Sequence, residues 1–300
     1  MNSADANEVI SSKLYTMKKA DEAALPTPVS SSPSSSLSPL HSWRGLRDFL
    51  MTQVDPELST VPLAGYCFMT GWIDAISFSA IFVWCAFQTG NSVQLALAIA
   101  RLFQGSPGHR DTSFHLADKQ ALTSLTTFLF GAFIGRIGDR IGAKTRAWLF
   151  LGTFIQALFT MAAAISLWKS GQGSVASDRA VPAWSSAGTY ACLGLISASM
   201  GLQGIMGKRV NTQFATTIVL TTVWCELMAD PKLFVTRRVA SRDHKIIAVT
   251  ALFVGGFCSR AILQSIGSPA SLGICTGLRV LIALSWFFVP ARQASDPRKP

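Results

Sequence analysis

Apolar segments of about 20 residues recur along the last four fifths of this 300-residue sequence. A helix of that length crosses a hydrocarbon layer of about 30 Å. Charged residues make up only 14% of the chain and hydrophobic residues 49%, which favours a membrane protein over a soluble one. The sequence therefore predicts an all-α fold, a polytopic transmembrane helical bundle with six to eight membrane segments. The eight candidate segments are 61–83, 86–103, 121–138, 147–168, 184–206, 213–230, 246–265 and 270–290.

Two of these segments, 86–103 and 213–230, are short and begin with polar residues. They can span fully, or they can be re-entrant or broken, which is tolerated only where protein or a water-filled cavity shields the backbone. Six crossings make the two halves of the chain inverted repeats, whereas eight make them parallel repeats. The sequence support for a repeat is the pair Thr89-Gly90 against Thr221-Thr222.

The distribution of basic residues predicts the orientation of the chain, because cytosolic loops carry an excess of Lys and Arg. The 21 basic residues near the segments divide 15 against 6 if all eight span, and 16 against 5 if the two polar segments are re-entrant. Both alternatives place the N-terminal tail, the loop 231–245 and the C-terminal tail in the cytosol.

Three regions follow from this pattern. Residues 1–57 are polar and rich in Ser and Pro, so we expect a disordered cytosolic tail. Within it, 42–51 is either a short amphipathic turn or a plain linker. Residues 58–291 form the predicted transmembrane helical domain, and 292–300 a short basic tail. The six cysteines lie in or beside apolar segments, so we expect reduced thiols rather than disulfides.

Two ordered blocks of sequence resemble the YoaK-like multi-pass membrane proteins, a family of unknown function. The resemblance covers roughly 62–290 and implies a membrane protein without an established reaction. One departure is Glu226, which stands where an Asp is usual. The blocks are Gly71-Trp-Ile-Asp74-Ala-Ile-Ser-Phe78 with Phe87-Gln-Thr-Gly-Asn91, and Gly201-Leu-Gln203 with Ala215-Thr-Thr-Ile-Val-Leu-Thr-Thr222 and Cys225-Glu-Leu-Met-Ala-Asp-Pro-Lys-Leu-Phe234. A short stretch, 135–144, also resembles a loop of the major facilitator transporters, whose twelve helices 300 residues cannot supply.

Ionisable residues within the apolar segments are candidate functional groups. Asp74 lies near the middle of the first segment, where a charge costs roughly 2.5–3.5 kcal/mol. We expect it to face the protein interior, to pair with another charge or to bind a proton, and Arg260 and Arg279 are its possible charge partners. A structural lock between helices and a role in binding an ion or substrate are equally open. Gln203 and Glu226 are the counterparts in the second half, and Glu226 lies close enough to its segment end to reach the interface.

Contiguous polar groups at Gln88, Thr89, Gly90 and Asn91 suit an interrupted helix beside a polar cavity. Hydrogen bonding between helices is the alternative, worth about 0.6 kcal/mol per contact. The predicted path for a substrate or ion is lined by Asp74, Gln88, Thr89, Gly90, Asn91, Gln203, Thr221, Thr222 and Glu226.

Small and aromatic residues have simpler interpretations. Gly255 with Gly256, and Gly131 with Gly135, are expected at close contacts between helices. Tryptophans near segment ends, among them Trp148, Trp184 and Trp286, are expected in the aromatic belts at the two interfaces.

No signature of an enzyme, metal site or cofactor occurs in the sequence: the four histidines lack ligand spacing, and there is no phosphate-binding loop or nucleophile elbow. The expected partner is the lipid bilayer together with a small-molecule solute, and the chain can form a homo-oligomer. Nucleic acid is not expected, because the basic residues lie between apolar segments rather than on one face. The leading hypothesis is a small-solute transporter or permease-like protein. The alternative is a non-transporting membrane scaffold or accessory subunit.

Overall fold

The computed structural model describes residues 39–106, 110–173, 183–210, 212, 217–218 and 220–292. The chain divides into two units, 1–44 and 45–300, and the packing described below lies within the second. The predicted tails at 1–57 and 292–300 fall largely outside the described residues. Within them, a helix over Pro39–Met51 agrees with the amphipathic turn rather than the linker at 42–51.

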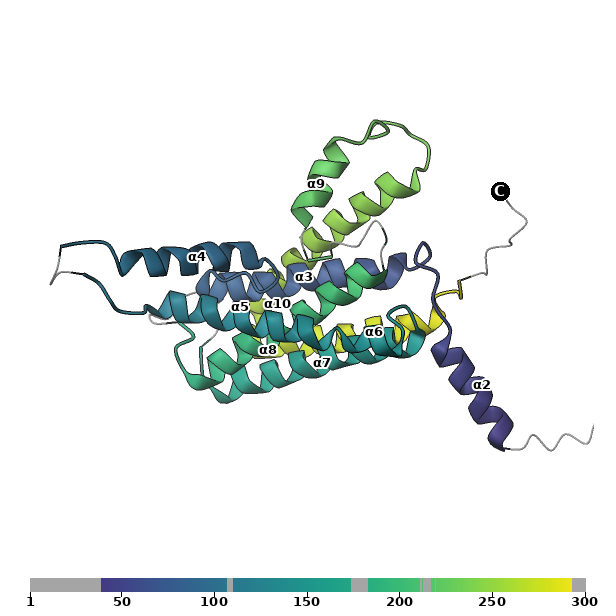
Figure 1. Cartoon of the computed structure of the whole chain (residues 1–300), viewed down its shortest axis with the longest axis horizontal. Coiled ribbons are helices and arrows are strands. Elements are labelled where there is room, and N and C mark those ends of the chain that lie inside the picture. Colours follow the sequence, from purple (N-terminus) through teal and green to yellow (C-terminus); the bar gives the residue numbers. More distant parts are fainter. Residues whose placement is uncertain are drawn as a thin grey trace, which may run out of the picture. The chain divides into compact units, whose positions relative to one another are not determined.

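The described residues of the second unit are helical, with two isolated β-bridges that join Gln53 to Thr145 and Val54 to Ala291. The all-α class is confirmed for these residues. Figure 1 shows the helices, which are α2 (Pro39–Met51), α3 (Thr60–Ile81), α4 (Gln88–Arg101), α5 (Leu116–Ile134), α6 (Ile137–Ile141), α7 (Arg146–Lys169), α8 (Ala187–Val210), α9 (Leu220–Met228), α10 (Ala240–Ser285) and the 3-10 turn η1 (Trp286–Phe288).

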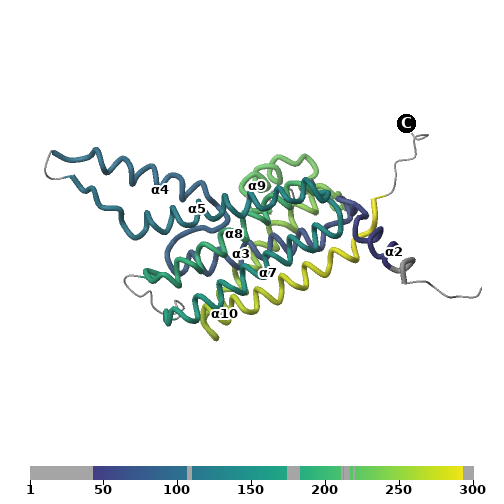
Figure 2. The backbone as a smooth tube through the Cα atoms, turned by 60° about the horizontal axis from the view of Figure 1, so that its bottom comes forward, coloured from purple at the N-terminus to yellow at the C-terminus, as the bar shows by residue number. Residues whose placement is uncertain are grey.

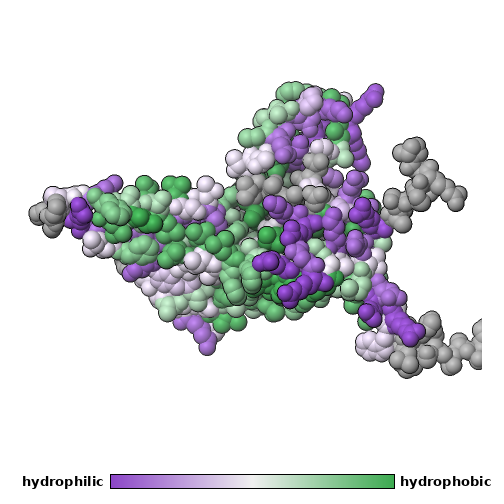
Figure 3. All heavy atoms as spheres, in the orientation of Figure 1, coloured by the Kyte–Doolittle hydropathy of each residue, from purple (hydrophilic) through white to green (hydrophobic). Residues whose placement is uncertain are grey.

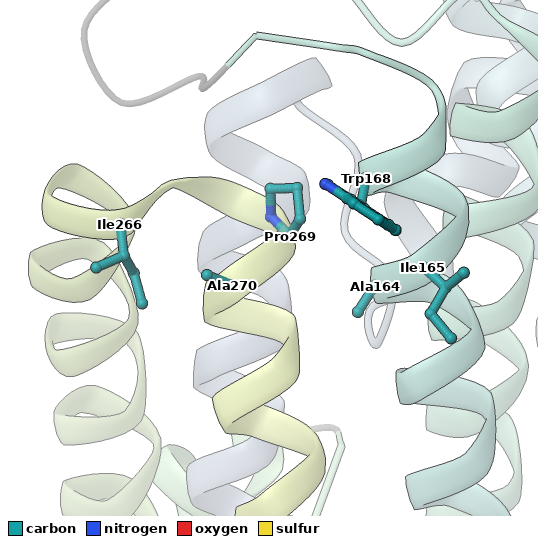
Figure 4. A pocket seen from close by; sticks show the side chains of 6 residues that line it. All are labelled: Ala164, Ile165, Trp168, Ile266, Pro269 and Ala270. Atoms are coloured by element: carbon teal, nitrogen blue, oxygen red, sulfur yellow. The ribbon is translucent and has the colours of Figure 1, made fainter.

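Helix α10 is two antiparallel helices joined at a sharp turn. Gly267 has φ 81° and ψ 171°, a backbone conformation that side chains disfavour, and Pro269 follows it. The first arm (240–266) and the second arm (268–285) then lie beside each other, as Figure 2 shows, with Ile266 and Ala270 on neighbouring arms in Figure 4. The break that the sequence predicts between 265 and 270 coincides with this turn.

Four helical stretches are long and apolar enough to cross a membrane, which is compatible with a membrane location. Helix α3, with 22 residues, is also long enough, but it carries buried polar side chains and is not among the four. The four stretches are Leu116–Ile141, Arg146–Lys169, Ala187–Val210 and Ala240–Phe288.

Beside its hydrophobic core, the bundle buries many polar side chains, and it exposes many large apolar ones, which is unusual for a soluble protein. Figure 3 shows hydrophobic residues over the flank formed by α4 and α5. Exposed hydrophobic residues include Val93, Leu97, Leu129, Phe130, Leu158, Met161, Phe253, Phe257 and Leu281. Buried polar residues include Thr70, Asp74, Asn91, Gln120, Gln156, Ser197, Gln203 and Arg279. Such a flank suits contact with lipid tails.

Two helix crossings of the same kind organise the bundle. Helix α3 crosses the first arm of α10, where a Cβ on Gly255 would lie 2.0 Å from the Phe68 carbonyl oxygen. Helix α5 crosses α8, where a Cβ on Gly131 would lie 1.9 Å from the Ala198 carbonyl oxygen. Only glycine allows backbones to approach this closely, so the predicted close contacts at these two glycines are confirmed.

The two crossings involve corresponding helices of two halves of the chain. The first half is α3, α4, α5 and α7, and the second is α8, α9 and the two arms of α10, each with a long helix, a short helix and two long helices. A local sequence match accompanies the match in packing: Gly131-Ala-Phe-Ile-Gly-Arg136 in α5 and Gly255-Gly-Phe-Cys-Ser-Arg260 in α10.

The equivalent helices α3 and α8 run in opposite directions. Tyr66 contacts Met206, whereas Thr70, one turn further along α3, contacts Gln203, earlier in α8. Helices α7 and the second arm of α10 are also antiparallel, since Gln156 contacts Arg279 and Thr153 contacts Trp286. The halves are therefore arranged as an inverted repeat.

Candidate functional site

Asp74 lies on α3 with 3% of its surface exposed. Its Oδ1 atom accepts a hydrogen bond from the Ala86 amide at 3.0 Å, which holds the loop before α4 against α3. Among the described residues, its Oδ2 atom is buried without a hydrogen-bond partner. A carboxylate oxygen left in this state retains the capacity to accept a hydrogen bond from another group.

A pocket of about 460 Å³ between α3 and the first arm of α10 is lined by both Asp74 and Arg260. Five aromatic side chains line it, and the rings of Phe78 and Trp84 stack at 4.2 Å between centroids. The structure thus brings one of the two predicted charge partners into the pocket of Asp74. An apolar wall with a carboxylate and a guanidinium can hold a small amphipathic molecule.

The polar cluster at the start of α4 divides between two faces. Gln88 donates to the Cys85 carbonyl at 2.8 Å and to Ser124 Oγ at 3.1 Å, while Asn91 donates to Gln88 Oε1 at 2.8 Å. Ser124 in turn contacts Ser197 Oγ on α8 at 2.9 Å. Thr89 and Gly90 are exposed. The arrangement therefore matches hydrogen bonding between helices, the alternative that the sequence leaves open for this cluster.

Gln203 belongs to a separate polar group where α8 meets α3. Its Nε2 atom donates to Thr70 Oγ1 at 2.9 Å and to the Tyr66 carbonyl at 3.0 Å. Thr70 also donates to the Thr217 carbonyl at 2.9 Å, which ties the segment before α9 to α3. Loops that precede both short helices are thus held by polar groups of α3.

The remaining predicted path residues, Thr221, Thr222 and Glu226, lie on the exposed surface of α9. Glu226 forms an ion pair with Lys245 at 3.7 Å, as an interfacial carboxylate can. The structure does not bring these three residues to the pocket that Asp74 lines.

Arg279, the other predicted charge partner, is fully buried on the second arm of α10 and does not contact Asp74. Its Nη1 atom donates to Gln156 Oε1 on α7, and its Nη2 atom lies 3.4 Å from Ser199 Oγ on α8. Beside it, the Tyr66 hydroxyl and Thr153 Oγ1 are 2.6 Å apart. Gln156, Ser199 and Tyr66 are not among the predicted site residues, although a Gln within the apolar segment 147–168 is a signal of a buried polar contact.

A second pocket, of about 400 Å³, lies between the end of α7 and the turn of α10 (Figure 4). Its lining is apolar apart from the indole of Trp168, so it offers little for recognising a polar solute. The lining residues are Ala164, Ile165, Trp168, Ile266, Pro269 and Ala270.

An inverted repeat of long apolar helices around buried polar groups defines a class of protein: a helical bundle compatible with a multi-pass membrane protein. Within that class, the chain belongs to the family described as "Protein of unknown function (DUF1275)", whose match covers residues 63–285. No curated protein and no solved structure matches the chain significantly.

Proposed function

We propose that this protein, a YoaK-like member of its family, is a small-solute transporter or permease-like protein without enzymatic activity. The observation that carries the proposal is the pocket in which the Asp74 carboxylate retains a buried oxygen without a described partner, within an inverted repeat. Many secondary transporters consist of inverted repeats, with sites near interrupted helices. The protein acts in a lipid bilayer, with no nucleic acid, metal or cofactor.

Six crossings fit this proposal best, made by α3, α5, α7, α8 and the two arms of α10. The segment before α3 and the segment after α10 lie at the same end of the bundle. The backbone amide of Asp55 donates to the Pro290 carbonyl at 2.9 Å, and the backbone amide of Val54 donates to the Lys144 carbonyl at 2.9 Å. Short helices α4 and α9, of 14 and 9 residues, then serve as re-entrant or interfacial elements. In this arrangement 16 of the basic residues near the segments lie on the cytosolic side, together with both tails, and 5 lie on the opposite side.

Cysteine accessibility distinguishes six crossings from eight. In a background with Cys225 replaced by serine, single cysteines at Ser106 and Thr236 are expected to react with a membrane-impermeant maleimide from opposite sides of the membrane. Eight crossings place both positions on one side, so labelling of both from the same side contradicts the six-crossing arrangement.

Flux through reconstituted vesicles tests the transport function. Light scattering after mixing with iso-osmotic small solutes reports entry of any of them, and the solute that enters fastest is used for the variants. Asp74→Asn keeps the size of the side chain and its contact with Ala86 but removes the charge, so we expect flux to fall at least about tenfold, or about 1.4 kcal/mol. Ser77→Ala, on the same helix and buried, is the matched control and is expected to keep wild-type flux.

A scaffold or accessory subunit is the second candidate, supported by the hydrogen-bonded network of Gln88, Asn91, Ser124 and Ser197, which holds helices together. Wild-type vesicles that admit none of the solutes, together with a partner that co-purifies in fixed ratio, would favour it. Unchanged flux in both Asp74→Asn and Asn91→Ala, at normal expression, would reject the proposed path.

A further inference from the structure

Arg279 is a fully buried guanidinium without a carboxylate partner. Its exposed fraction is 0%, and the ion pairs formed by the described residues do not include it. Its closest oxygen acceptor is the neutral amide of Gln156, and the sulfur atoms of Cys275 and Met200 are further hydrogen-bond partners. A buried charge with neutral partners alone is strongly disfavoured, and in membrane segments such residues mark substrate or ion pathways.

The free edge of this guanidinium has the geometry that recognises an oxyanion. Nη1 is occupied by Gln156, and Nε is buried without a hydrogen-bond partner. Nη2 makes a long contact with Ser199 Oγ, at 3.4 Å, and a weak hydrogen bond with the thioether sulfur of Met200, also at 3.4 Å. Nε and Nη2 point to the same side of the planar group. Together they can donate two parallel hydrogen bonds to a carboxylate or phosphate.

The position of Arg279 agrees with a site for a transported solute. Its neighbours Gln156 and Ser199 lie near the middle of α7 and α8, at mid-depth of the bundle. Tyr66 of α3 adds a buried hydroxyl beside them. The first half of the chain contributes α3 and α7, and the second contributes α8 and α10, so the groups meet at the interface between the inverted halves, where transporters bind substrates.

We propose that this centre binds an anion, with the Nε–Nη2 edge of Arg279 as its main contact, and that the solute carries a carboxylate or phosphate group. The proposal rests on the transport function proposed above and names its substrate class. Because the guanidinium is enclosed, entry requires the two halves to move apart, as alternating access does.

Thermal unfolding of the purified full-length protein in detergent tests anion binding without requiring transport. Sodium acetate and sodium phosphate are titrated at constant ionic strength against sodium chloride. We expect a saturable rise in the unfolding temperature with acetate or phosphate, because a ligand that binds only the folded state stabilises it. Arg279→Met is expected to remove this rise, whereas Arg140→Met, at an exposed site, keeps it.

Arg279→Lys provides a variant that keeps the charge but lacks the two-donor edge, and we expect its apparent affinity to fall at least tenfold. The proposal is overturned if the wild type shows no saturable rise, or if Arg279→Met keeps the same concentration dependence. The two proposals fail differently: saturable binding without flux supports the anion site and rejects transport. Flux of neutral solutes without anion-dependent stability rejects the anion site and keeps the permease.

Discussion

Gly255→Ala is expected to prevent stable folding of the bundle, whereas Gly256→Ala, one position further on, is expected to be tolerated. A Cβ at Gly255 would lie 2.0 Å from the Phe68 carbonyl oxygen, and that backbone atom cannot rotate away. At Gly256 the nearest atom would be 3.5 Å away, an ordinary contact. Overpacking usually costs about 1–3 kcal/mol, and separating two helix backbones should cost more. The measurement is the yield of monodisperse protein in size-exclusion chromatography after detergent extraction.

Gly255→Ala and Gly256→Ala both raise helix propensity, by about 1 kcal/mol each, so a difference between the two variants reports packing alone. The inverted repeat supplies an independent second test at the other crossing. Gly131→Ala, whose Cβ would lie 1.9 Å from the Ala198 carbonyl oxygen, should behave like Gly255→Ala. Gly273→Ala, with open space around its Cβ, is its control. Equal yields from Gly255→Ala and Gly256→Ala would contradict the close crossing.

Much of the architecture could be predicted because hydrophobic periodicity and length are local properties of a sequence. Six of the eight apolar segments correspond to long helices, and the two polar ones, 86–103 and 213–230, contain the short helices α4 and α9. The turn of α10 falls where Gly267 and Pro269 interrupt the pattern, and the six cysteines are free as predicted. The tryptophans show that a position near a segment end does not determine whether a side chain is buried. Trp148, Trp184 and Trp286 lie near segment ends, yet each is 0–1% exposed, so they pack in the core and do not form the predicted aromatic belt. Trp84, Trp168 and Trp224, which belong to the same prediction, are 37%, 69% and 51% exposed and agree with it.

The candidate site could be predicted only in part, because sequence gives the identity of a polar residue but not the face of the helix on which it lies. Asp74 is buried as predicted. Thr89 and Gly90 are exposed, whereas the side chains of Gln88 and Asn91 beside them face α5. The environment of Arg279 depends on α3, α7 and α8 at once. Its contacts join residues 80 and 123 positions apart, a separation at which no periodicity carries information.

Gln156→Leu is expected to destabilise the protein strongly, by about 3–5 kcal/mol, because it removes the closest oxygen acceptor of the buried Arg279 and leaves the charge poorly compensated. Leucine fills a similar volume, so the loss reflects the missing acceptor rather than a cavity. Titration with sodium dodecyl sulfate, followed by intrinsic tryptophan fluorescence, measures unfolding of the purified variants.

The double variant Gln156→Leu with Arg279→Met gives the decisive comparison. Replacing a buried charge by an apolar side chain is often neutral or stabilising, so Arg279→Met alone should unfold close to the wild type. If the cost of Gln156→Leu arises from the stranded guanidinium, the double variant should recover most of the lost stability, a strong coupling between residues in contact. Additive effects would show that Gln156 stabilises the bundle through its contact with Met206 at 3.2 Å instead. Recovery would mean that the guanidinium is tolerated in the empty protein only because Gln156 compensates it, as expected of a group retained to bind an anion rather than to stabilise the bundle.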